Sequence, residues 1–254
     1  MEEKINALIK SYVNDYSNKK DVFSQWQQPI TKFASAKDPD FKKLKMSVDH
    51  SHLMPEDLLK NAKTIITYFL PFEKSIADSN KKGKNSSREW SVAYIETNQL
   101  ISDLNQYIIK FLEKEGYKGT LIPATHNFNE ETLISQWSHR HVAEIAGLGT
   151  FGLNNMLITE AGCCGRIGSI VTTIDLKPSD KVNEENCLYK YDGSCGICVE
   201  NCKFGALTYD KFNRKRCYEI CLMNDQYHTN LGVTDVCGKC CVNLHCSFKN
   251  PRST

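Results

Sequence analysis

Cysteine is absent from the first 162 residues of this chain, although the full sequence of 254 residues contains 12. Long apolar runs are missing too. The best, residues 64–70, is far shorter than the roughly 20 residues of a membrane-spanning helix. Neither charge sign dominates, because the net charge is +2, so composition gives no electrostatic reason to expect a nucleic-acid partner. These absences predict a cytoplasmic protein without a membrane segment.

The cysteines are confined to the region from Cys163 onward, and the N-terminal residues are acidic and amphipathic, unlike a secretory signal. A secreted disulfide scaffold would spread its cysteines through a short chain. Thiols stay reduced in the cytoplasm, so cysteines gathered at one end favour ligation of a metal or an iron–sulfur cluster.

Helices and strands are expected to alternate over residues 1–177, which predicts an α/β (α+β) domain. Apolar spacing and helix signals predict helices at 5–13, from Pro55, at 91–115 and from 130 to 147. Strands are expected at 64–70, 119–124 and 168–176, and a polar, solvated connection at 74–89. After Leu176 this periodicity is lost, so we expect a second, cysteine-rich domain over residues 178–254.

The stretch AGLGTFGLNN, residues 146–155, contains a complete G-x-G-x-x-G. A dinucleotide fingerprint needs a strand before the glycines and a helix after them. Here a helix is expected before the glycines and a strand-like segment, NMLIT, after them, so the pattern does not predict nucleotide binding. Gly147 is expected to end the helix, and three closely spaced glycines suit a backbone that approaches a large flat ligand.

Two groups of cysteines carry the strongest signal. The first, Cys195-x2-Cys198-x3-Cys202, matches the end of the bacterial ferredoxin run C-x2-C-x2-C-x3-C. Asp192 occupies the position of the first cysteine in that run, so we expect Cys187 to replace it across a short insertion. The second group supplies Cys217, Cys237, Cys240 and Cys246.

Two-cluster ferredoxins exchange a fourth ligand between their cysteine groups, so we predict two [4Fe–4S] clusters. Cluster one takes Cys187, Cys195, Cys198 and Cys246, and cluster two takes Cys202, Cys217, Cys237 and Cys240. Four cysteines remain. Cys221 and Cys241 lie close enough to proposed ligands to replace one, whereas Cys163 and Cys164 are expected as small buried residues beside a glycine turn. The alternative is a zinc site built from the pairs Cys195/Cys198 and Cys237/Cys240.

The glycine segment with GSIVT after it, the earlier HLMPEDLLKNAKTIITY and the two cysteine groups together resemble epoxyqueuosine reductases and the related reductive dehalogenases. The similarity extends from about Pro55 to Cys246. It implies a nitroreductase-like core that holds base-off cobalamin, followed by a ferredoxin-like domain whose two clusters reduce the cobalt. The implied reaction is a reductive elimination on a substrate above the corrin.

Under this resemblance, Gly147, Gly149 and Gly152 would approach the corrin, and Asn154 and Asn155 would bond its amide side chains. The implied partners are an electron donor such as a ferredoxin or flavodoxin, and a substrate that is a small molecule or tRNA. Three features depart from the family. GCCGR, residues 162–166, places two adjacent cysteines where the family leads us to expect none. No aspartate lies between Ile122 and Gly149, where the family carries its general acid, and no room remains for the helical-repeat domain that grips tRNA.

Histidines are the candidates to replace the missing acid: His126, His139 and His141. For each, the alternative is an exposed, capping or packing role. Residues two apart on a helix point about 200° away from each other, so we expect only one of His139 and His141 to face a given pocket. The predicted function is a cobalamin-dependent iron–sulfur reductase. The alternative is an electron-transfer protein that reductively activates a partner, such as a corrinoid protein, without cobalamin of its own.

Overall fold

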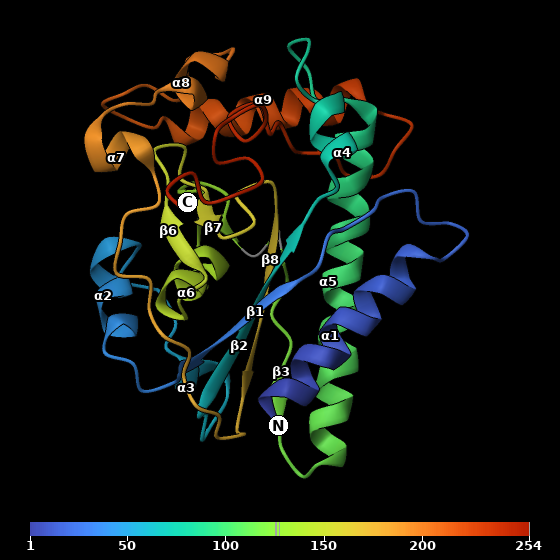
Figure 1. Cartoon of the computed structure of the whole chain (residues 1–254), viewed down its shortest axis with the longest axis vertical. Coiled ribbons are helices and arrows are strands. Elements are labelled where there is room, and N and C mark those ends of the chain that lie inside the picture. Colours follow the sequence, from blue (N-terminus) through green and yellow to red (C-terminus); the bar gives the residue numbers. More distant parts are fainter. Residues whose placement is uncertain (125, 127, 254) are drawn as a thin grey trace.

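The computed structural model describes residues 1–124, 126 and 128–253. Its centre is an antiparallel sheet with the strand order β1–β2–β8–β3. These strands are β1 (Ile30–Ser35), β2 (Thr64–Pro71), β8 (Gly165–Thr172) and β3 (Gly119–Thr120). β2 pairs with β8 over its whole length, and helices cover both faces of the sheet (Figure 1).

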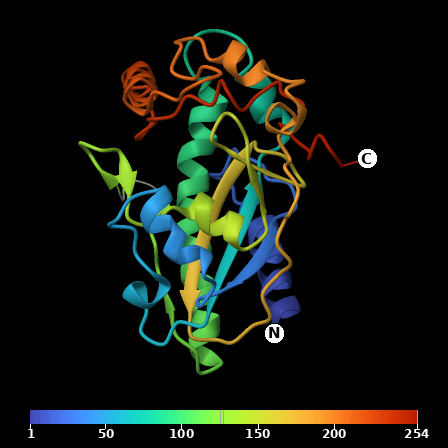
Figure 2. The same ribbon diagram turned by 90° about the vertical axis from the view of Figure 1, so that its left-hand side faces the viewer.

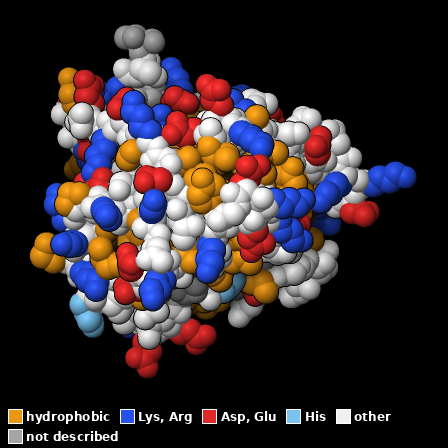
Figure 3. All heavy atoms as spheres, turned by 90° about the horizontal axis from the view of Figure 1, so that it is seen from below, with side chains coloured by type: hydrophobic (Ala, Val, Ile, Leu, Met, Phe, Trp, Pro, Cys, Tyr) orange, Lys and Arg blue, Asp and Glu red, His pale blue; other side chains and the backbone are white. Residues whose placement is uncertain are grey.

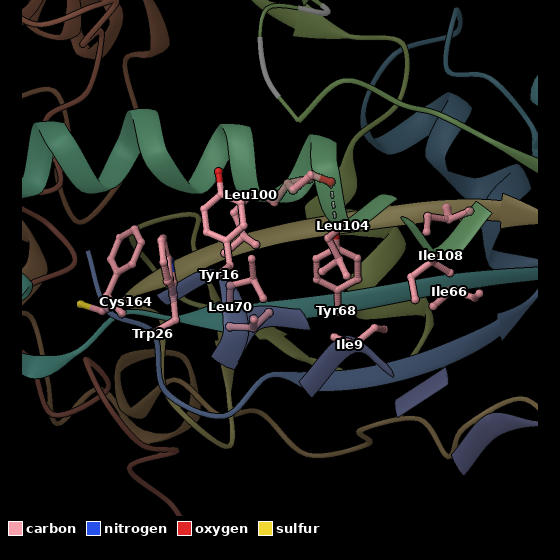
Figure 4. Packing of buried hydrophobic residues seen from close by; sticks show 14 of the residues in the cluster. Ile9, Tyr16, Trp26, Ile66, Tyr68, Leu70, Leu100, Leu104, Ile108 and Cys164 are labelled. Carbon is pink, nitrogen blue, oxygen red and sulfur yellow. Dashed lines mark hydrogen bonds between the residues drawn. The ribbon is translucent and has the colours of Figure 1, made fainter. Parts of the chain in front are cut away.

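One face of the sheet packs against α1 (Glu2–Ser17) and the long helix α5 (Arg88–Lys114). Alternate side chains of β2, including Tyr68, point into this layer and meet Leu104 of α5 (Figure 4). The Tyr68 hydroxyl donates to the side-chain oxygen of Asn105 at 2.7 Å, so the one polar atom of this ring has a partner. This layer forms the larger hydrophobic core.

Leu104 is fully buried in this core, so its replacement by alanine should leave a cavity. We expect Leu104→Ala to lower the free energy of unfolding by about 2–5 kcal/mol. Met46 on α2 (Asp40–Ser47) is largely exposed, and Met46→Ala should change that free energy by less than about 0.5 kcal/mol. Denaturant unfolding of the two variants and the wild type checks this. Equal stabilities for the two variants would contradict it.

The other face of the sheet is covered by α2, α3 (Pro55–Leu58) and α6 (His139–Ile145). Ile65 of β2 packs here with Phe41 of α2 and Val142 of α6. Every residue of β2 is therefore buried. Two covered faces explain why residues 64–70 form a continuous run without the polar alternation of a half-exposed strand.

The C-terminal third lies across one end of the sheet, where β8 begins (Figures 1 and 2). Its helices are α7 (Leu188–Asp192), α8 (Ile197–Asn201) and α9 (Arg214–Tyr227). The backbone N–H groups of Cys163 and Cys164 donate to the carbonyls of Cys246 and Ser247 at 2.9 and 3.0 Å. These bonds attach the end of the cysteine-rich region to the start of β8.

The opposite end of the molecule carries side chains of both charges, mixed with apolar ones (Figure 3). This mixture agrees with the small net charge of the chain. Within the described residues, no helix combines the length and the apolar character needed to cross a membrane.

The helix expected from residue 130 to 147 is wrong over its first half. Instead, β4 (Phe128–Asn129) and β5 (Ile134–Ser135) form a hairpin, and only α6 is helical. The side-chain oxygen of Asn129 accepts hydrogen bonds from the backbone of Glu131 and Thr132, which competes with helical pairing. Leu133 has φ 56°, a conformation that a right-handed helix excludes.

Other differences are smaller. β1 and α2 were not expected, the strand at 119–124 is limited to β3, and the helix from Pro55 has a single turn. The segment at 74–89 is not merely a solvated connection, because it contains α4 (Lys74–Ser79) and the buried side chains of Asn80 and Ser86. After α6, β6 (Gly149–Phe151) and β7 (Leu157–Thr159) form a hairpin, so the helix-then-strand order expected around the G-x-G-x-x-G is confirmed.

Candidate functional site

Four cysteines line a small cavity, here named the small cysteine cavity: Cys187, Cys195, Cys198 and Cys246. They are the four residues predicted for cluster one. Burial and then the nearby thiols of Cys246, Cys187 and Cys195 raise the pKa of Cys198 to about 12. Four thiols this close cannot all ionise without a compensating positive charge, which bound iron supplies. The donor set therefore fits a [4Fe–4S] cluster.

Cys187 reaches this cavity because the insertion after it folds compactly. Residues 188–192 form α7, and Gly193 ends it in the left-handed region with φ 77°. Cys187 is the residue immediately before this helix, and Cys198 lies on α8. One helical turn thus spans the position of Asp192, where a ferredoxin run would place its first cysteine.

A second cavity of about 370 Å³, the large cysteine cavity, is lined by the four residues predicted for cluster two. These are Cys202, Cys217, Cys237 and Cys240. The backbone N–H of Leu207 donates to the Cys202 sulfur at 3.3 Å, as suits a thiolate that carries negative charge. Cys163, Cys221 and Cys241 line the same cavity, so seven cysteines surround a space that needs four ligands.

The loop that carries Cys237 and Cys240 is fixed to the α/β core by buried polar side chains. Asn80 donates to the carbonyl of Cys237 at 2.9 Å, and Asn154 donates to that of Cys240 at 2.8 Å. The ammonium of Lys239 donates to the carbonyls of Asn80 and Lys82, each at 2.8 Å. The core therefore positions these two cysteines through its own side chains.

The zinc alternative is not supported by this arrangement. Cys195 and Cys198 line the small cavity, whereas Cys237 and Cys240 line the large one, so the two pairs do not share a site. Across the described part of the chain, no three His, Cys, Asp or Glu side chains converge as a single metal ion requires. Thiolates on a cubane bind separate corners and need no such convergence.

A third cavity, of about 430 Å³, adjoins the large cysteine cavity; we name it the arginine–histidine cavity. The two share lining residues: Phe128, Met156, Cys163, Gly165 and Arg166. Besides the thiol of Cys163, its charged and titratable side chains are those of three arginines and three histidines: Arg140, Arg166, Arg214, His126, His139 and His141. Leu133, near which the family's aspartate would align, also lines it.

All three predicted histidines thus border one cavity, and the expectation that only one of His139 and His141 would do so is wrong. Both belong to the first turn of α6, which begins at the cavity wall, so side chains that diverge still reach it. His141 binds the Ser138 hydroxyl at 2.7 Å, and burial with the charge of Arg140 lowers its pKa to about 4. His126 lies 3.6 Å from a carboxylate oxygen of Asp235.

His139 uses both ring nitrogens inside the protein. Its Nε2 donates to the carbonyl of Pro123 at 2.9 Å, and its Nδ1 accepts from the Ser169 hydroxyl at 2.8 Å. That hydroxyl in turn accepts from the indole N–H of Trp137 at 3.0 Å. These contacts describe a neutral histidine that positions α6 on β8; its role as a proton donor stays a prediction.

His139 should make the protein sensitive to acid. Burial lowers its pKa from 6.5 to about 4, so its contribution to stability is present above pH 6.5 and is lost as pH falls through 4. The full loss is about 3 kcal/mol. Denaturant unfolding between pH 7 and 4 should show a shallower decline for His139→Asn than for wild type. Identical slopes would contradict the assignment.

The predicted cobalamin contacts have other partners. A Cβ on Gly147 would overlap the backbone of Asp180, and one on Gly149 would overlap the carbonyl oxygen of Ile158. Gly152 packs against the side chain of Asn154. That side chain donates to the carbonyl of Cys240 and accepts from the backbone N–H of Met156. The carbonyl of Asn155 accepts from Arg140. Packing within the protein thus accounts for the three glycines and for Asn154, and contact of the five residues with cobalamin stays a prediction.

Several residues of the site were not found from the sequence. Asp235 accepts a 2.6 Å hydrogen bond from the Tyr94 hydroxyl and is almost fully buried beside His126. Arg166 lies over the ring of Tyr94, 4.6 Å from its centre. Residues 94, 166 and 235 are far apart in sequence and share no pattern, so only the fold brings them together.

The described residues define a mixed α/β fold with a cysteine-rich end. More particularly, the chain has the fold of epoxyqueuosine reductase. The structure of that enzyme from Streptococcus thermophilus matches with a TM-score of 0.56 at 18% identity, covering 96% of this chain and 67% of that one. The structure of the Bacillus subtilis enzyme matches with a TM-score of 0.55 at 19% identity, covering 92% of this chain and 64% of that one.

An epoxyqueuosine reductase structure with an epoxyqueuosine-modified tRNA-Tyr stem loop matches with a TM-score of 0.56 at 18% identity, over 94% of this chain and 64% of that one. This chain spans about two thirds of the length of these proteins. No protein-family model matches it, and no curated protein matches it by sequence.

Proposed function

We propose that this protein is an iron–sulfur reductase that passes electrons through two [4Fe–4S] clusters to an acceptor in the arginine–histidine cavity. One observation carries the proposal: two sets of four cysteines line separate cavities, and the second cavity shares a wall with the arginine–histidine cavity. An electron that reaches cluster two is therefore adjacent to the place where an acceptor would bind. The fold of epoxyqueuosine reductase supports the same order of components.

Each [4Fe–4S] cluster carries one electron at a time. A two-electron reduction of a bound substrate therefore consumes two electrons from an external donor, delivered one after the other, and two protons. We propose a ferredoxin or flavodoxin as that donor. For the protons we propose His126, supported by its contact with Asp235; His141, whose pKa burial and the charge of Arg140 lower to about 4, is the weaker candidate.

Cobalamin is the acceptor that the resemblance implies, and it would supply a cobalt centre for reductive chemistry. Of the glycines first expected to hold it, Gly147 and Gly149 pack closely against the protein's own backbone. The arginine–histidine cavity shares a wall with the large cysteine cavity, so a cobalamin that contacts it would lie next to cluster two. We therefore propose that cobalamin, when bound, contacts this cavity.

Anaerobic reconstitution tests the proposal in two measurements. Two clusters predict about eight iron atoms and eight sulfides per chain, with a broad brown absorbance. Titration with cobalamin should then give stoichiometric binding with a base-off spectrum. Zinc in place of iron would overturn the reductase proposal. Eight irons without cobalamin binding would instead support the alternative, an electron-transfer protein that reduces a partner.

A further inference from the structure

The arginine–histidine cavity is strongly cationic. Arg140 of α6, Arg166 of β8 and Arg214 of α9 reach it from three different elements. None of the described residues that line it is an aspartate or glutamate. Clustered positive charges repel one another, so a folded protein keeps such an arrangement at a cost unless an anion balances it.

Arg166 shows the imbalance most directly. It forms no ion pair or hydrogen bond with the part of the chain that the structure describes, and its buried Nε has no partner. The nearest acidic group, Asp235, already accepts from Tyr94, and Arg166 only stacks on the Tyr94 ring. A buried guanidinium nitrogen without an acceptor is unfavourable, and an oxyanion in the cavity would satisfy it.

The other two arginines use only part of their guanidinium groups. One nitrogen of Arg140 donates to the carbonyl of Asn155, and one nitrogen of Arg214 donates weakly to the carbonyl of Thr132, at 3.4 Å. Both acceptors are neutral, and neither arginine forms an ion pair with a described carboxylate. Burial lowers the pKa of Arg140; the thiols of Cys241 and Cys240 act to raise it, and the charges of Arg214 and Arg166 act to lower it.

The remaining wall of the cavity is largely apolar and includes Phe69, Trp137 and Leu157. Such a wall packs against the body of an organic molecule, while a guanidinium binds a carboxylate or phosphate through paired hydrogen bonds. We propose that this cavity binds a small organic anion, with an oxyanion group held by Arg140, Arg166 and Arg214. That the anion is the substrate rests on the proposed reductase function; that it binds does not.

Arg166 also borders the large cysteine cavity, so it has a second possible partner in the negative charge of cluster two. Arg140 and Arg214 do not line that cavity, but a hydrogen bond from Cys221 and then the charge of Arg140 lower the pKa of Cys217 there. If all three arginines bind one anion, substitution of Arg140 should weaken binding as much as substitution of Arg166 does. If Arg166 serves the cluster alone, its substitution changes only the cluster's reduction potential.

The test uses the full chain with its clusters, without cobalamin, and three probes of similar shape: benzoate, phenyl phosphate and the neutral benzamide. Calorimetric titration should show binding of at least one anion, at least about tenfold tighter than benzamide and weaker at high salt. Arg140→Gln and Arg166→Gln should each weaken it about tenfold or more. Preference between benzoate and phenyl phosphate identifies the oxyanion.

Arg216→Gln is the matched control, because Arg216 lies on α9 two residues from Arg214 but pairs with Glu219 outside the cavity. It should leave anion binding unchanged. Circular dichroism and iron content confirm that each variant is folded and loaded. The proposal is overturned if no anion binds, if benzamide binds equally well, or if the Arg140 and Arg166 variants bind like wild type. Absent clusters would overturn the reductase function while leaving anion binding measurable.

Discussion

Cys240→Ala should remove about half of the iron and sulfide from the reconstituted protein, leaving about one [4Fe–4S] cluster per chain. Cys240 lines the large cysteine cavity only, and a cubane that lacks one of its four thiolates is bound far more weakly. Iron and sulfide analysis, with electron paramagnetic resonance of the reduced protein, measures the loss.

Cys221→Ala is the control for this assignment. Cys221 lies one helical turn after Cys217 on α9 and lines the same cavity, yet it is outside the proposed ligand set. It should keep about eight irons per chain. Full iron in the Cys240 variant, or half in the Cys221 variant, would show that another cysteine completes cluster two.

Gly238→Ala should be the most damaging single substitution in the cluster-two loop. Gly238 has φ 72°, which L-residues adopt with strain, and an added Cβ would overlap the indole ring of Trp90. Strain and overlap together predict a loss of about 3 kcal/mol or more in the free energy of unfolding. Because Gly238 follows Cys237 directly, its displacement should also remove cluster two.

Gly193→Ala separates strain from overlap. Gly193 has nearly the same backbone angle, φ 77°, but an added Cβ would meet no atom within 4 Å. It should lose only about 1–2 kcal/mol and keep both clusters. Thermal unfolding and iron content of the two variants provide the comparison, and similar losses in both would rule out the contact with Trp90 as the cause.

The elements that could be predicted from sequence are those whose pattern is set by burial. Residues 64–70 are apolar because both faces of β2 are covered, and α5 shows a helical period because only one of its faces is buried. The segment at 128–135 misled the prediction because its apolar residues were spaced acceptably for a helix. The side chain of Asn129 stabilises this turn through its hydrogen bonds to the backbone, and the spacing of apolar residues does not reveal such bonds.

The grouping of cysteines could be predicted from the exchange of a fourth ligand in two-cluster ferredoxins, which assigns Cys202 to the later group and Cys246 to the earlier one. Each predicted set of four lines its own cavity, although the ligation itself stays a prediction. The arginine–histidine cavity could not be read in this way. Arg166, Asp235 and Tyr94 meet through tertiary packing alone. Cys164 lies outside both proposed ligand sets, and its thiol donates to the carbonyl of Cys241 at 2.9 Å, a contact that the sequence does not reveal.

The two cysteine cavities are nested along the chain. Cys198 and Cys246 line the small cavity, and every cysteine proposed for cluster two lies between them in sequence. A cluster bound at the small cavity therefore closes a loop that contains the whole second site, and loop closure lowers the conformational entropy of the unassembled chain. The two clusters should then be unequal in assembly. Loss of cluster one releases the loop that holds cluster two, whereas loss of cluster two leaves that closure intact.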